Sequence, residues 1–151
     1  MRTSLALLAL LLTAPLASAQ DVSADPTYGD VSLDEGFMPD PHTTSLMAGG
    51  SVEVDLPGCS YGAVAEAPDV DLYYTTSGDS DLYIYAVSGE DTTILVNTPS
   101  GSWTCDDDSY GDGDPIVVIR SAEAGLYDIW VGTYGDDMAE ATLFISEVDP
   151  R

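Results

Sequence analysis

The chain is a succession of short β-forming runs, and no stretch of helical periodicity separates them. The runs are rich in valine, isoleucine, threonine and tyrosine, and glycine, serine, aspartate or proline stands between them. This spacing of turn residues is typical of antiparallel strands joined by hairpins and short loops. The sequence predicts strands at Asp30–Leu33, Thr43–Met47, Ser51–Leu56, Asp71–Thr75, Asp81–Val87, Thr92–Asn97, Ser102–Cys105, Ile116–Arg120, Leu126–Tyr134 and Ala141–Glu147.

Alternation within the longer runs indicates which faces are buried. In the run LYDIWVGTY, Tyr127, Ile129 and Val131 share one face of a strand, because side chains alternate along it. Asp128 and Trp130 take the other face. The run ATLFISE alternates in the same way. Many short strands with one buried face predict an all-β fold, an antiparallel β-sandwich.

The first residues have the three-part layout of a secretory signal peptide. One cation, Arg2, precedes the apolar run LALLALLL, and small residues follow at Ala17 and Ala19. The run is shorter than the roughly 18 residues that cross a bilayer. We expect cleavage after Ala19, so that residues 1–19 are removed and residues 20–151 reach the periplasm or the extracellular medium. An uncleaved membrane anchor is the alternative.

The mature chain is strongly acidic. Arg120 and Arg151 are its only cations against 27 acidic residues, and lysine is absent. Almost nothing here would neutralise phosphate, so we expect no nucleic-acid partner and no membrane partner after signal cleavage. Metal ions and cationic partners suit this charge. A role in solubility, or in surroundings salty enough to screen the repulsion, explains it equally.

The two cysteines, Cys59 and Cys105, belong to a chain that is expected to be exported. Disulfides persist in oxidising compartments, so the sequence predicts a Cys59–Cys105 disulfide. In the chain-entropy view such a long closed loop contributes roughly 4 kcal/mol. A metal-binding or catalytic thiol is the weaker alternative, because neither cysteine has a histidine or a second cysteine nearby.

The stretch CDDDSYGDGDP, residues 105–115, holds five aspartates and no cation. Calcium takes six to eight oxygen ligands, and carboxylates on a turn-rich loop supply them. The sequence predicts that Asp106, Asp108, Asp112 and Asp114 converge on one calcium ion. The spacing is not that of an EF-hand, because a tyrosine stands fifth and no glutamate stands twelfth. The alternative is a hydrated acidic hairpin loop without metal.

A second acidic group consists of Asp69 and Asp71, which stand two residues apart in APDVDLYY. The same spacing recurs at Asp79 and Asp81 in GDSDLY. Aspartates at the start of a strand either accept hydrogen bonds from loop amides or contribute to a metal site. We favour the capping role over metal binding for this group.

Aromatic residues on the predicted strands suggest a second possible function, the binding of a ligand by exposed rings. Tyr83 and Tyr85 share one face of their predicted strand, and Trp130 lies off the apolar face of its own. On a surface they would form a platform for sugar rings or a peptide. This is the alternative function, a module that binds extracellular polysaccharide or protein. Ordinary β propensity and cross-strand pairing explain the same residues without a ligand.

Catalytic motifs are weak. A nucleophilic serine needs an adjacent base that a third group orients, and His42 is the only histidine. Ser80 in GDS lacks the glycines expected after a protease serine. The sequence contains no HExxH, P-loop or GxGxxG motif. We therefore expect no catalytic residue. A small hydrolase, with Ser80 or an unidentified carboxylate pair, is the weakest alternative.

Four segments of the chain, in their order, resemble the bacterial pre-peptidase C-terminal domain family. They are APDVDLYYT, DTTILVNTPSGSWTCDDDS, AGLYDIWVGTY and ATLFIS. DPTYGDVSLDEGFMPDP and AGGSVEV are similar to the N-terminal half of its small stand-alone secreted members. The resemblance implies one jelly-roll-like β-sandwich over residues 20–151, with a leader strand region at 20–58 and the family core at 59–148. It implies a non-catalytic binding or stabilising module. Some members of the family bind calcium. Where stand-alone members carry a peptidase label, the resemblance implies that the label derives from the enzymes to which such domains are usually attached.

Overall fold

The computed structural model describes residues 19–135 and 137–151. The predicted signal peptide, residues 1–19, lies outside the described residues except at Ala19. The described part is all-β, and it holds no helix of the length and apolarity needed to cross a membrane.

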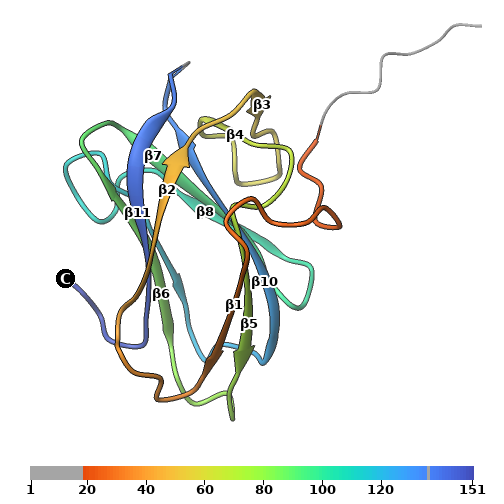
Figure 1. Cartoon of the computed structure of the whole chain (residues 1–151), viewed down its shortest axis with the longest axis vertical. Coiled ribbons are helices and arrows are strands. Elements are labelled where there is room, and N and C mark those ends of the chain that lie inside the picture. Colours follow the sequence, from red (N-terminus) through yellow and green to blue (C-terminus); the bar gives the residue numbers. More distant parts are fainter. Residues whose placement is uncertain (1–18, 136) are drawn as a thin grey trace, which may run out of the picture.

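Eleven strands in the described residues form two sheets that pack face to face as a β-sandwich, so the predicted fold class is confirmed (Figure 1). Sheet A contains β1 (Asp30–Asp34), β3 (Val52–Glu53), β4 (Ala63–Val64), β5 (Val70–Thr75), β7 (Thr92–Asn97), β8 (Trp103–Asp106) and β10 (Gly125–Thr133). Sheet B contains β2 (His42–Ala48), β6 (Leu82–Ser88), β9 (Ile116–Ile119) and β11 (Ala139–Ser146).

Strand pairing is antiparallel except at one edge of sheet A. There β1 pairs with β5 in parallel, and Asp30 lies opposite Asp71. A parallel pair cannot be joined by a hairpin, and the chain between these strands passes through β2, β3 and β4. On its other side β5 pairs with β10, and β10 pairs with β7 and β4. In sheet B the order is β2, β11, β6, β9, so β2 is an edge strand.

The main core lies between the sheets. Tyr127, Ile129 and Val131 of β10 face Leu143 and Ile145 of β11 within one cluster, and each is at most 1% exposed. The predicted alternation of both strands is therefore confirmed. Burial of a side chain of this size stabilises the fold by about 1.5–3 kcal/mol.

A second apolar cluster covers the outer face of sheet A, the face turned away from sheet B. Trp130 is fully buried there beneath the flap, which we define as residues 50–64 and which includes β3 and β4. The predicted disulfide is present, and it ties Cys59 of the flap to Cys105 of β8. The flap approaches β10 closely at Gly62 (φ +66°), where a Cβ would lie 2.5 Å from the carbonyl oxygen of Thr133.

The turn into β10 is fixed by a side chain. The Tyr127 hydroxyl donates to the carbonyl oxygen of Glu123 at 2.7 Å, four residues earlier, in the manner of a tyrosine corner. Burial raises the pKa of Tyr127 to about 12, which keeps the hydroxyl a donor. Gly125 lies between these residues with φ +145°, and a Cβ there would lie 2.7 Å from the Pro99 ring. The bond thus fixes the turn into β10, and the missing side chain of Gly125 leaves room for the Pro99 ring.

Candidate functional site

The aspartate-rich loop leads from β8 to β9, and its first acid is already engaged. One Asp106 oxygen accepts hydrogen bonds from the Ser109 amide and the Ile116 amide, both at 2.9 Å. The other oxygen accepts from the Ser109 hydroxyl at 2.6 Å. Asp106 therefore joins the two ends of the loop and holds the start of β9.

The far end of the loop is a tight turn. Asp112 (φ +58°) and Gly113 (φ +81°) occupy its two central positions, and Gly111 and Asp114 pair across it. Aspartate and glycine are the residues that most readily adopt two successive positive φ values in a hairpin turn. Asp114 is 8% exposed, and its carboxylate accepts from the Ser88 amide at 3.0 Å. Asp112 itself is exposed at the tip.

The loop acids therefore divide into two groups. Asp106 and Asp114 hold backbone amides, whereas Asp108 and Asp112 are exposed. Burial, together with the charges of neighbouring aspartates, raises the pKa of Asp107. Among residues 19–135 and 137–151, no group of three or more acidic, histidine or cysteine side chains is placed to hold a metal ion. Calcium binding at Asp106, Asp108, Asp112 and Asp114 stays a prediction.

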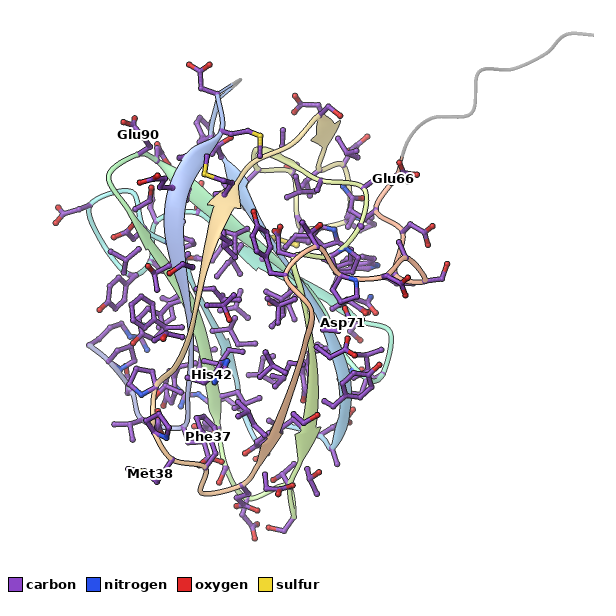
Figure 2. All side chains as sticks on the ribbon, in the orientation of Figure 1. Phe37, Met38, His42, Glu66, Asp71 and Glu90 are labelled. Carbon is purple, nitrogen blue, oxygen red and sulfur yellow. A yellow bond between two sulfur atoms is a disulfide. The ribbon has the colours of Figure 1, made fainter. Side chains whose placement is uncertain are left out.

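The second acidic group is larger than the sequence indicated. Asp71 of β5 lies directly opposite Asp30 of β1 on one side and Asp128 of β10 on the other. Directly paired residues project from the same face of a sheet. Leu72, the next residue, belongs to the main core, so these aspartates project from the outer face of sheet A. We call Asp30, Asp71 and Asp128 the acidic row. Figure 2 shows Asp71 on the β5 side of the sandwich, away from His42 of β2.

Asp69 lies immediately before β5, two residues before Asp71 of the acidic row. It is 2% exposed, and its carboxylate accepts a hydrogen bond from the Val131 amide at 2.7 Å. Burial raises its pKa to about 7, although the amide bond acts in the opposite direction. The favoured capping role thus describes Asp69, which connects β5 to β10.

Asp71 and Asp128 differ from Asp69 because each has an oxygen without a partner. They are 7% and 4% exposed, and one buried carboxylate oxygen of each receives no hydrogen bond from any described residue. Burial, followed by the charges of Asp128 and Asp30, raises the pKa of Asp71 to about 6. Burial also raises the pKa of Asp128. A side-chain hydrogen bond between the two carboxyl groups also contributes to these pKa shifts, so the pair is arranged to share one proton.

The aromatic residues considered as a ligand platform are largely enclosed. Tyr83 and Tyr85 project from the outer face of sheet B, but each is only 6% exposed. The Tyr85 ring is stacked between Tyr110 and Phe144, with centroid distances of 4.9 and 4.7 Å. Neither face of Tyr85 is free for a sugar ring. Trp130 lies off the main-core face of β10, as predicted, but it is fully buried because the flap covers it, so it offers no surface for a ligand.

The residues considered for hydrolysis have other partners. The Ser80 hydroxyl donates to Glu35 at 2.6 Å, and the same carboxylate accepts from the amide and hydroxyl of Ser77. The Ser77 amide, followed by the two serine hydroxyls, lowers the pKa of Glu35 to about 2. A carboxylate of such low basicity is a poor general base near neutral pH. His42 lies on β2 opposite Ile145 of β11.

Comparison with known proteins adds no relative to this geometry. No family model matches the chain, and neither a curated protein nor a solved structure matches it. The functional argument therefore depends on the fold and on the acidic row.

Proposed function

We propose that this chain is a non-catalytic, exported β-sandwich module that binds a divalent cation, calcium in the first instance, and is stabilised by it. The observation that carries the proposal is the pair Asp71 and Asp128. Two cross-strand aspartates, both more than nine-tenths buried, each hold an oxygen that no described residue satisfies. The proposal includes membership of the pre-peptidase C-terminal domain family, which the chain resembles, and export of the mature chain.

The pair needs a positive partner. Directly opposed Cβ atoms in a sheet lie about 5 Å apart, and two unit charges at that distance repel by about 3 kcal/mol at an effective dielectric constant of about 20. A shared proton or a bound cation removes this repulsion. Protonation suffices at acidic pH, because the pKa of Asp71 is about 6. A cation would take the place of this proton as the pH rises above that value.

The acidic row suits calcium better than a softer metal. The side chains of the acidic row offer only carboxylate oxygens, which are the donor atoms that calcium and magnesium prefer. Asp30 is exposed at the edge of the row, and the charge of the exposed Asp25 also acts on Asp71. The described side chains of this region do not form a three-ligand group, so Asp30 or Asp25 would have to turn toward an ion held by Asp71 and Asp128. Water and backbone oxygens would complete its coordination.

The aspartate-rich loop is the second candidate for the same ion. Asp107 and Asp108 are adjacent on it, and the charge of Asp91 contributes to the raised pKa of Asp107. Its weakness is that Asp106 and Asp114 already accept backbone hydrogen bonds. No comparable observation in the described residues supports the two other functions. These are a ligand platform at Tyr83, Tyr85 and Trp130, and a hydrolase based on Ser80.

The test is a thermal melt of residues 20–151 in excess calcium and in a chelator, with magnesium and matched ionic strength as controls. Calcium at a hundredfold over its dissociation constant adds about 2.7 kcal/mol to stability. We expect this shift in the parent protein and in Asp108→Asn, and its loss in Asp128→Asn. In the chelator, Asp128→Asn should melt above the parent, because the buried repulsion is gone.

Each outcome decides one point. A calcium shift that is lost in Asp108→Asn and kept in Asp128→Asn would move the ion to the aspartate-rich loop. A parent protein without a calcium-specific shift would remove cation binding from the proposal altogether.

A further inference from the structure

Within the described residues the outer edge of β2 has no neighbouring strand, and one of its outward amides, that of Met47, is taken up by a side chain. The Met47 amide donates to the Tyr28 hydroxyl at 2.8 Å, so this amide points away from β11. In an antiparallel pair, alternate residues point their amides and carbonyls to the same side. Thr43 and Ser45 therefore point outward as well, and within the described residues no partner strand lies on that side.

The outward positions of β2 carry neither a charged residue nor a proline, although Pro41 precedes the strand and Tyr28 occupies the Met47 amide. Natural sheets guard their edges with charged residues, proline or bulges. Thr43, Ser45 and Met47 project outward from β2 without a charge, in a chain that has 27 acidic residues. By contrast β1, the edge strand of sheet A, begins and ends with the aspartates Asp30 and Asp34. A seven-residue edge strand without an acidic residue is thus a local exception on an acidic surface.

A groove of about 660 Å³ lies beside this edge on the outer face of sheet B. Met47 and Tyr28 line it near β2, with 38% and 37% of their surface exposed, and Val87 lines it on β6 with 37% exposed. Glu140 of β11, directly opposite Met47, is exposed in the groove. The groove therefore combines apolar walls with one carboxylate.

We propose that the β2 edge binds an extended basic peptide segment of a partner protein as an added strand. The main chain of the segment pairs with the outward amides and carbonyls of Thr43 and Ser45. A lysine or arginine side chain crosses Met47 and reaches Glu140. The remaining apolar side chains of the segment lie against Tyr28.

Charge decides in favour of a basic partner over a second copy of the chain. The formal net charge is −24, so two copies brought edge to edge repel each other. The cations of the described residues, Arg120 and Arg151, are each paired with an aspartate. A basic segment meets attraction over the whole approach. The proposal concerns sheet B and does not depend on a cation at the acidic row.

The probe is a short synthetic peptide in which lysine and valine alternate, titrated into residues 20–151 by calorimetry and followed by amide chemical shifts. Its controls are the same peptide with glutamate for lysine, and with every backbone amide N-methylated so that neither edge of the peptide can donate a hydrogen bond. We expect the basic peptide alone to bind and to shift the amide resonances of Thr43 and Ser45. The N-methylated form should fail, because it cannot pair with an edge strand.

Variants locate the site. Ser45→Pro removes one outward amide from an edge position where proline is tolerated, and should weaken binding by about tenfold. Ser45→Lys leaves the backbone intact and should weaken binding by repulsion, which covers the case in which Ser45→Pro does not fold. Glu140→Gln should weaken binding about threefold to tenfold, whereas the matched change Glu123→Gln at an exposed acid elsewhere should not.

Four results would overturn the proposal. The first is absence of binding at millimolar peptide. The second is equal affinity for the acidic or N-methylated peptide. The third is unchanged affinity in both Ser45 variants. The fourth is a dimer in sedimentation that Ser45→Lys dissociates, which would make a second copy the occupant of the edge.

Discussion

Asp69 makes the stability of the fold depend on pH in the range between its ordinary and its native pKa. The carboxyl group is 2% exposed, and burial raises its pKa from 3.8 to about 7. The folded chain therefore holds this proton more tightly than the unfolded chain does. The stabilisation is fully present below about pH 4 and is lost as the pH rises through 7. Each pKa unit corresponds to about 1.4 kcal/mol, so the whole effect is about 4 kcal/mol.

About 3 kcal/mol of this change falls between pH 5 and pH 8. For a domain of this size that corresponds to a decrease in melting temperature on the order of 10 °C. The raised pKa of Asp71, about 6, acts in the same direction. Glu35, whose pKa is lowered to about 2, stabilises the fold above its ordinary pKa and loses this effect only below pH 4.5. The interval from pH 5 to pH 8 therefore isolates the buried aspartates.

The assay is thermal unfolding followed by circular dichroism at fixed ionic strength in the presence of a chelator. Asp69→Asn keeps an oxygen that can accept the Val131 amide but removes the titration. We expect a smaller decrease with pH in this variant and a higher melting temperature than the parent at pH 8. Asp108→Asn, at an exposed acid, controls for general repulsion and should keep the decrease of the parent. A parent melting temperature that is flat or rising over this interval, or an equal decrease in Asp69→Asn, would refute the reasoning.

Two further predictions concern the covalent and hydrogen-bonded supports of the fold. Replacing both Cys59 and Cys105 by serine should lower the free energy of unfolding by roughly 4 kcal/mol, because the disulfide closes a loop with a sequence separation of 46. Chemical denaturation measures this, and a loss below 1 kcal/mol would contradict the role of the disulfide. Tyr127→Phe should cost about 1 kcal/mol, because it removes only the hydrogen bond to Glu123. Thr142→Ser, which leaves the tyrosine corner untouched, is its control, and equal losses in the two variants would exclude a specific contribution of the corner.

The strands of the sandwich could largely be predicted from the sequence because their signal is local. Thr92–Asn97 is predicted and observed with the same bounds, since turn residues flank a compact apolar run. The run Ser51–Leu56 also has β-forming composition, but only Val52–Glu53 forms a strand. Its partner Ala63–Val64 is too short to leave a periodic pattern. Both belong to the flap, whose shape depends on the disulfide and on contact with Trp130.

The acidic row could not be predicted, because it depends on register between distant segments. The sequence indicates Asp71 as one of two acids at the start of a strand. It indicates Asp128 only as a residue off the apolar face of its strand, and nothing local places it beside Asp71. Asp30 joins the acidic row because β1 pairs in parallel with β5. These strands are not consecutive in the chain, so the sequence does not indicate that they pair. The burial of Trp130 was missed for a similar reason, because the flap that covers it comes from residues far earlier in the chain.

The position of the tryptophans has a consequence for spectroscopy. Both tryptophans of the chain, Trp103 and Trp130, lie in the cluster beneath the flap, with ring centroids 5.5 Å apart. The main core between the sheets contains tyrosine but no tryptophan among the residues that the structure describes. Intrinsic tryptophan emission therefore reports the state of the flap and its disulfide, whereas far-ultraviolet circular dichroism reports the strands of the whole sandwich. Comparing the two signals during one titration would separate opening of this outer layer from unfolding of the interior.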